Sequence, residues 1–128
     1  MRSGRPNERF APLVLVVDDS PVARLAIARR LRADGFDVLE QASAVTPDVA
    51  TLARLACALL DLDLGDSDGA ALAGSLRAGH AGLPVAFFSA SVSSELLARA
   101  RAVGPVFAKP GELDAAIAWV NQSARTGP

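Results

Sequence analysis

The 128-residue chain is poor in several residue types, and each shortage excludes a class of protein. Its single cysteine, Cys57, excludes an internal disulfide and fits a reducing compartment. The formal net charge of −1 argues against a protein that binds nucleic acid directly, which would normally be clearly basic. No apolar run approaches the ~20 residues of a membrane span, and the arginine-containing N-terminus lacks the apolar core of a signal peptide. We therefore expect a cytoplasmic protein without a membrane contact.

Aromatic residues make up only 5% of the chain, and much of its apolar content is alanine, whose small side chain lets helices pack closely on a sheet. The length suits one domain, which at this size buries roughly two thirds of its unfolded surface. We expect this domain to span residues 12–123, between a polar tail over residues 1–11 and a frayed end over residues 124–128. Cys57 lies inside an apolar run and is expected to be buried and unreactive.

Five short apolar segments have the composition of buried strands, because each is too short for a free-standing helix. They are residues 13–17, 36–40, 55–60, 85–88 and 106–108. Amphipathic segments with helix-starting residues follow them. These predicted helices cover residues 21–34, about 47–54, 68–78, about 94–103 and 113–123. Short loops and right-handed crossovers then give an α/β fold, with a parallel sheet covered by helices on both faces.

Side chains that can cap a helix precede several of these segments. Ser20 before Pro21 and Ser93 before an amphipathic segment are expected to be N-caps. Thr46 before Pro47 predicts the same start for the short second helix.

Polar side chains follow four of the five predicted strands: Asp18 and Asp19, Asp61, Ser89, and Lys109. Because the carboxyl ends of parallel strands lie at one edge of a sheet, these side chains should meet at a single site. Three neighbouring carboxylates repel one another unless a cation such as Mg²⁺, which prefers carboxylate oxygens, lies between them. A carboxylate can accept phosphorus, and a lysine suits a phosphoryl oxygen. The set therefore indicates magnesium-dependent phosphoryl transfer.

In five motifs the sequence resembles the receiver domains of two-component response regulators, in particular the single-domain, chemotaxis-regulator-like ones. The motifs are Val17-Asp18-Asp19-Ser20, Leu59-Leu60-Asp61, Asp68-Gly69, Phe88-Ser89-Ala90 and Lys109-Pro110, in the order of that family and near its spacing. The resemblance covers about residues 12–123. It implies a flavodoxin-like fold, a doubly wound parallel sheet of five strands in the order 2-1-3-4-5 with five helices.

The resemblance implies that Asp61 is the phosphoacceptor for a sensor histidine kinase or a histidine phosphotransfer protein. Asp18, Asp19, Asp61 and the backbone carbonyl of Asp63 would hold Mg²⁺. The domain would then be a switch that catalyses at most its own phosphorylation and dephosphorylation. It would signal by contact with a downstream protein, and a homodimer is one open possibility.

The resemblance also implies how the phosphoryl group is held. Lys109 would pair with Asp61 and then with the phosphoryl group, while Ser89 would turn inward. The backbone N–H groups of Asp63 and Ala90 would surround the phosphoryl oxygens. The peptide bond from Lys109 to Pro110 is expected to be cis, as is typical of the family.

Three positions depart from the pattern of the family. Gly65 replaces a proline that most members carry, and Val106 stands where many members have an aromatic residue that takes part in the switch. Phe107, one residue further, should face the other side of the sheet. Asp63 adds a carboxylate two residues after Asp61; it either controls the lifetime of the acyl phosphate or is a solvated loop charge.

Two alternatives to a phosphorylatable receiver come from other classes. Leu60-Asp61-Leu62-Asp63 resembles the nucleophile motif of haloacid-dehalogenase-type phosphatases, but that assignment leaves Asp18 and Asp19 unexplained. A pseudo-receiver that only docks would not need the intact set of polar residues. Elsewhere, Trp119 should be partly exposed on the last helix, as a partner contact or as packing against a neighbouring helix. His80 is expected to be solvent-exposed rather than a metal ligand.

Overall fold

The structure is a computed structural model that describes residues 11–125. The tail expected over residues 1–11 lies almost wholly outside the described residues, as do residues 126–128 of the expected frayed end. None of the described helices is long and apolar enough to cross a membrane.

Five parallel strands form the central sheet. They are β1 (Leu13–Val17), β2 (Asp37–Gln41), β3 (Leu55–Leu60), β6 (Val85–Ser89) and β7 (Val106–Ala108). Their order is β2-β1-β3-β6-β7, which is 2-1-3-4-5 when only the strands of this sheet are counted. The structure therefore confirms the flavodoxin-like, doubly wound sheet.

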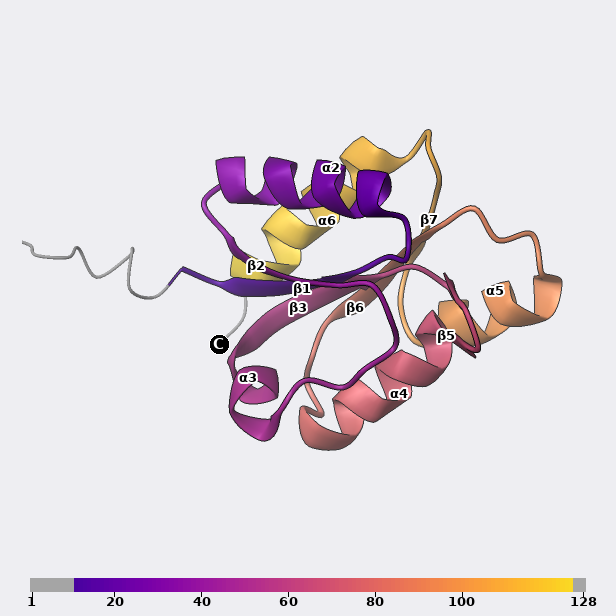
Figure 1. Cartoon of the computed structure of the whole chain (residues 1–128), viewed down its shortest axis with the longest axis horizontal. Helices are drawn as coiled ribbons and strands as arrows, with labels where there is room; N and C mark the ends of the chain where they lie inside the picture. Colours follow the sequence, from indigo (N-terminus) through magenta and orange to yellow (C-terminus); the bar gives the residue numbers. More distant parts are fainter. Residues whose placement is uncertain (1–10, 126–128) are drawn as a thin grey trace, which may run out of the picture.

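Five helices cover the two faces of this sheet (Figure 1). They are α2 (Pro21–Ala33), α3 (Val49–Arg54), α4 (Gly69–Gly79), α5 (Ser94–Arg101) and α6 (Leu113–Arg125). Helices α2 and α6 lie on one face, and α3, α4 and α5 lie on the other. Successive residues of β1 contribute to opposite cores: Leu15 packs on the α3–α5 side, while Val14 and Val16 pack on the α2–α6 side. This two-sided burial explains why the strands are continuous apolar runs.

Two of the three predicted N-cap residues are confirmed, and the third prediction is wrong. The hydroxyl of Ser20 accepts from the N–H of Ala23 at 3.3 Å, and that of Ser93 accepts from Leu96 at 3.2 Å. Helix α3, however, is capped by Asp48 and not by Thr46. The Asp48 carboxylate accepts from the N–H of Thr51 at 2.8 Å, and this backbone hydrogen bond lowers the pKa of Asp48.

The last helix continues to Arg125, two residues beyond the end predicted at residue 123. Ala124 is buried against the α2–α6 core. The Arg125 guanidinium lies 4.4 Å from the centre of the Phe36 ring and also donates to the carbonyl of Asp34. These contacts, with residues that follow α2, stabilise the last turn of α6. The sequence near Arg125 does not indicate them.

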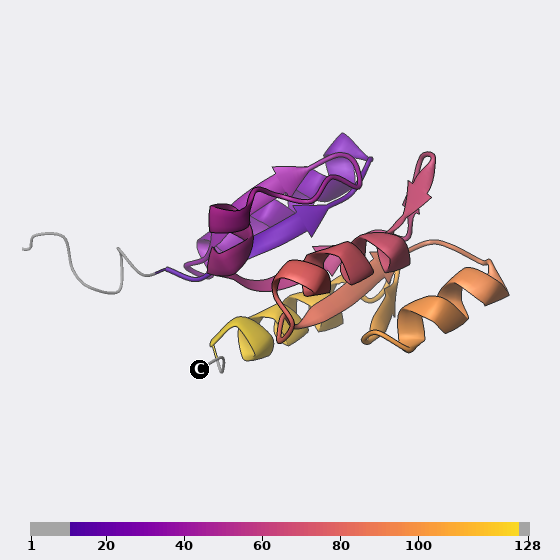
Figure 2. The same ribbon diagram turned by 90° about the horizontal axis from the view of Figure 1, so that it is seen from below.

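A small hairpin follows the third strand of the sheet and was not expected. Strands β4 (Asp63–Leu64) and β5 (Ser67–Asp68) pair antiparallel, and Gly65 in the turn has φ +68°. Glycine adopts that backbone conformation without the steric cost other residues have. Figure 2 shows the hairpin extending away from the sheet, next to the start of α4. The side chain of Leu64 is buried in the core on the α3–α5 side, which ties the hairpin to the domain.

Candidate functional site

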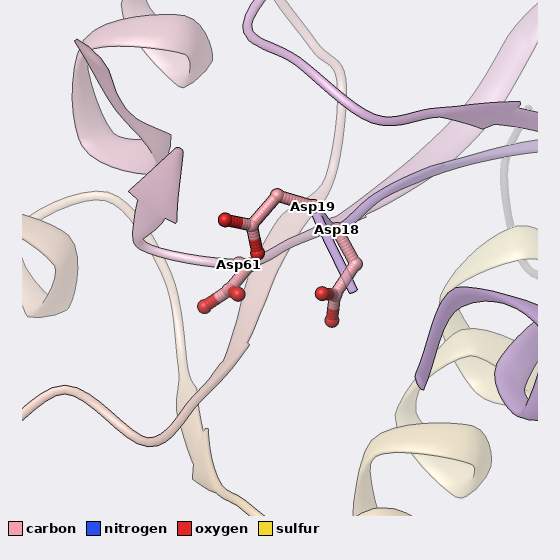
Figure 3. Close-up of side chains that lie close together, drawn as sticks. All are labelled: Asp18, Asp19 and Asp61. Carbon is pink, nitrogen blue, oxygen red and sulfur yellow. The ribbon is translucent and has the colours of Figure 1, made fainter. Parts of the chain in front are cut away.

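Three carboxylates gather where β1 and β3 end (Figure 3). The two strands are neighbours, and the N–H of Asp61 donates to the carbonyl of Val17 at 2.8 Å. As a result, Asp18, Asp19 and Asp61 each place a carboxylate oxygen within 4.8 Å of the other two. Asp18 and Asp61 are only 1% and 6% exposed, whereas Asp19 faces solvent. The cluster is therefore half enclosed, with an open side at Asp19.

Lys109 comes from the end of β7 and neutralises part of this charge. Its Nζ lies 2.7 Å from Oδ2 of Asp18 and 3.1 Å from Oδ2 of Asp61. It is the only lysine of the chain. Its backbone N–H donates to the carbonyl of Ser89 at 2.9 Å, and the following peptide bond to Pro110 is cis, as expected.

Burial by itself lowers the pKa of Lys109. The hydrogen bonds to Asp18 and Asp61, together with their negative charges, outweigh burial, and the pKa of Lys109 is raised above its usual value. A raised lysine pKa means that the ammonium form is fully present at neutral pH. The stabilising contact is complete below about pH 10.4, where a free lysine ionises, and is lost as the pH rises through the higher value of the folded chain.

The other oxygens of the two buried carboxylates accept backbone hydrogen bonds. Oδ1 of Asp18 accepts from the N–H of Ser20 at 2.9 Å, and Oδ1 of Asp61 accepts from the N–H of Leu62 at 2.7 Å. The amine of Lys109 thus contacts two fixed carboxyl groups of a cluster of three. Such a set of oxygen donors fits a hard divalent cation such as Mg²⁺.

The remaining predicted residues lie around this cluster. Ser89 is the last residue of β6 and is 4% exposed; its hydroxyl accepts from the N–H of Ser91 at 3.1 Å. Ala90 follows it and is exposed. Asp63 begins β4 with an exposed side chain that makes no hydrogen bond or ion pair within residues 11–125. The structure thus brings together the three aspartates and Lys109. Ser89 is joined to Lys109 by the backbone hydrogen bond between the strand ends.

One contact near the site could not be read from the sequence. Asp68 caps α4 by accepting from the N–H of Ala71 at 2.8 Å, and its carboxylate also lies 3.3 Å from Nη1 of Arg99 on α5. The cap agrees with the prediction that this helix starts at Asp68. The ion pair joins residues 31 positions apart, and no local spacing indicates it.

Three residues outside the cluster were also assigned a burial from the sequence, and the structure agrees with two of these assignments. Cys57 is fully buried, and burial raises the pKa of its thiol to about 12, which fits an inert residue. Trp119 is partly exposed, as expected, and packs against the α2–α6 core. His80 is not solvent-exposed as predicted: it is half-buried, with Nε2 3.0 Å from the carbonyl of Leu55.

The fold and the cluster define the class of the protein: a doubly wound α/β domain with three carboxylates and a lysine gathered at the carboxyl edge of its parallel sheet. The chain belongs to the response regulator receiver domain family, whose family model matches residues 14–119. A comparison with curated proteins finds no match.

Solved structures with the same fold include several receiver domains. A CheY-like receiver domain protein from Methanospirillum hungatei has a TM-score of 0.77 at 19% identity, covering 90% of this chain and 94% of that one. For the chemotaxis protein CheY4 of Vibrio cholerae the TM-score is 0.74 at 20% identity, with 88% and 98% covered. The receiver domain of a Francisella response regulator gives 0.71 at 24% identity, with 89% and 97% covered.

Proposed function

We propose that Asp61 accepts a phosphoryl group from the phosphohistidine of a sensor histidine kinase or a histidine phosphotransfer protein. The receiver family is one of phosphoacceptor switches, generally not enzymes. The observation that carries the proposal is the position of Asp61, whose carboxylate lies against Lys109 and beside Asp18 and Asp19. Because such donors are phosphorylated from ATP inside the cell, the proposal places the chain in the cytoplasm.

In the proposed step, an oxygen of Asp61 forms a bond to phosphorus while the bond between phosphorus and the histidine nitrogen breaks. The product is an acyl phosphate, and the leaving imidazole takes up a proton. Asp18, Asp19, Asp61 and the carbonyl of Asp63 would hold Mg²⁺, which neutralises charge on the phosphoryl oxygens when bound. The charged Lys109 stays beside Asp18 and pairs with a phosphoryl oxygen.

In the proposal, Ser89 also contacts the phosphoryl group. Its hydroxyl accepts a hydrogen bond from the N–H of Ser91, and the hydroxyl hydrogen is free to rotate. Donating this hydrogen to a phosphoryl oxygen on Asp61 would add a charge-assisted hydrogen bond, which is stronger than one between neutral groups. The backbone N–H groups of Asp63 and Ala90 would complete the set of donors around the phosphoryl oxygens.

The output of the switch cannot use the aromatic residue that many receivers carry. Val106 packs on the α3–α5 core and Phe107 on the opposite, α2–α6 core, so Phe107 cannot replace an aromatic at position 106. We propose that phosphorylation is read through direct contact with a downstream protein, without an aromatic rotation at this position.

Phosphorylation by acetyl phosphate tests the acceptor directly. With Mg²⁺ present, mass spectrometry of the intact chain should show one added phosphate, and Asp61→Asn should show none. Asp66→Asn, at an exposed position in the same loop, is the matched control and should be labelled normally. Labelling of Asp61→Asn would contradict the proposal. Repeated turnover of a phosphate monoester would instead favour the phosphatase alternative, which the family match does not support.

A further inference from the structure

Arg24 is a basic side chain of α2 that reaches back to the backbone of the turn between β1 and α2. Its Nη1 donates to the carbonyl oxygen of Asp18 at 2.7 Å. Its side chain is 20% exposed, whereas Arg30 and Arg32 on the same helix are each 46% exposed. Arg24 is thus half-buried against the backbone of the residue that also supplies a carboxylate to the acidic cluster.

The guanidinium of Arg24 is itself held in position by β2. Its Nε lies 3.6 Å from Oε1 of Glu40, and the other oxygen of Glu40 lies 2.9 Å from Nη1 of Arg32. Glu40 therefore bridges two arginines that lie more than one turn apart on α2. The neighbouring residue of β2, Gln41, accepts a hydrogen bond from the N–H of Asp18 at 3.1 Å.

Every polar group of Asp18 consequently has a partner. The N–H donates to Gln41, the carbonyl accepts from Arg24, and the carboxylate is held by the N–H of Ser20 and by Lys109. Asp19 differs, because no group within residues 11–125 donates a hydrogen bond to its carboxylate. The direction of the Asp19 side chain depends on the peptide plane between Asp18 and Asp19, and the Asp18 carbonyl that Arg24 holds belongs to that plane.

We propose that Arg24 is a positioning residue for the metal-binding end of β1: by fixing the Asp18 carbonyl it aims the Asp19 carboxylate at the cluster. The inference rests on the proposed function, since it concerns the same Mg²⁺ site. Arg24 would act only through the backbone and would not touch the ion. Groups that orient metal ligands in this way commonly change metal affinity strongly when they are removed.

Titration of the unphosphorylated chain with Mg²⁺ alone, followed by NMR or calorimetry, tests the inference. Arg24→Met should raise the Kd for Mg²⁺ about tenfold. Arg24→Lys, which keeps a donor for the Asp18 carbonyl, should restore most of the affinity. Arg29→Met, at an exposed position of the same helix, should leave the Kd unchanged. Saturating Mg²⁺ should return acetyl phosphate labelling of Arg24→Met close to the wild-type rate, which a general loss of structure would not allow.

A wild-type Kd in Arg24→Met would overturn the inference. So would a raised Kd that Arg24→Lys fails to improve, because that result indicates general damage to the turn. If Arg24→Met does not fold, Glu40→Gln decides, because it frees Arg24 without removing it: a raised Kd supports the inference and an unchanged one overturns it. A wild-type chain that binds no Mg²⁺ would contradict the proposed function itself, which is a separate and recognisable result.

Discussion

Asp63 lies two residues after Asp61, and its own carboxylate has no partner among the described residues. It is exposed, and its side chain makes no hydrogen bond or ion pair with any described residue. Two positions past Asp61, its negative charge can act on a water molecule that attacks the acyl phosphate. We predict that Asp63→Asn changes the rate of autodephosphorylation at least severalfold, measured as the decay of the phosphorylated mass after acetyl phosphate is removed. Asp66→Asn is the control, and equal decay in all three proteins would identify Asp63 as a solvated charge only.

Cys57 gives a prediction about pH. Burial raises the pKa of its thiol to about 12 in the folded chain, while an unfolded cysteine ionises near 8.5. The unfolded state therefore gains stability above that pH, and folding stability should fall by about 1.4 kcal/mol for each further pH unit. The chain has no tyrosine, and the pKa of its one lysine is raised, so few other groups contribute between pH 8 and 10.

Denaturant unfolding of wild type and Cys57→Ala at pH 8, 9 and 10 measures this effect. Cys57→Ala should be less stable at pH 8, because it leaves a small cavity, but should lose less stability as the pH rises. Parallel curves for the two proteins would show that the thiol ionises in the folded state, and so is not buried in solution.

Single residues also show what could be predicted from the sequence. The acidic cluster was predictable because the carboxyl ends of parallel strands lie at one edge of the sheet. The proximity of Asp18, Asp61 and Lys109 follows from their positions at these strand ends. The cap of α3 was assigned wrongly, because Thr46 and Asp48 are both good caps and only the backbone decides between them. The prediction that His80 is solvent-exposed was also wrong, because its contact with the carbonyl of Leu55 joins positions 25 apart in the sequence.

Among the elements, α4 begins directly against the backbone that follows β3. The N–H of Gly69, the first residue of the helix, donates to the carbonyl of Leu62 at 3.0 Å. A Cβ at position 69 would lie 2.1 Å from the carbonyl oxygen of Asp61, far inside contact distance. Glycine is therefore required here by the packing of helix on strand, since no side chain can lie between them.

We predict that Gly69→Ala destabilises the chain by about 1–3 kcal/mol, as overpacked sites do, and slows acetyl phosphate labelling, because Asp61 must shift. Gly74→Ala is a matched control in the same helix, where an added methyl group would meet only open space. It should stabilise the chain by about 0.5–1 kcal/mol through helix propensity. Thermal unfolding and labelling rates of both variants check the pair, and similar effects of the two substitutions would contradict the packing argument.

A helix or strand was predictable where its pattern of apolar and polar residues is long enough to be recognised. The five strands of the sheet lie within one residue of the predicted bounds, because continuous apolar runs mark strands buried on both faces. The hairpin of β4 and β5 has two residues in each strand, which is too short for any alternation to show. The extension of α6 to Arg125 depends on contacts with Phe36 and Asp34, which are far away in the sequence.

The whole molecule combines two cores, one on each face of the sheet, with a site in which carboxylates outnumber amines. Repulsion within the cluster opposes the folding of the domain. A cation bound there stabilises the folded state alone, because the three carboxylates come together only when β1 and β3 pair. Binding and stability are therefore linked.

We predict that Mg²⁺ raises the midpoint of thermal unfolding and that EDTA reverses the effect. At a Mg²⁺ concentration of 100 times the Kd the folded state gains about 2.7 kcal/mol, which corresponds to an increase of several degrees for a domain of this size. Asp19→Asn should reduce the increase sharply, since it removes a ligand. Without metal it should unfold at a higher temperature than wild type, since it also removes one repelling charge. Sodium chloride at matched ionic strength separates specific binding from screening, because screening would raise the midpoint equally with either salt. An equal effect of the two salts on the wild-type chain would mean that the acidic cluster holds no particular ion, and that its three carboxylates are gathered for another purpose.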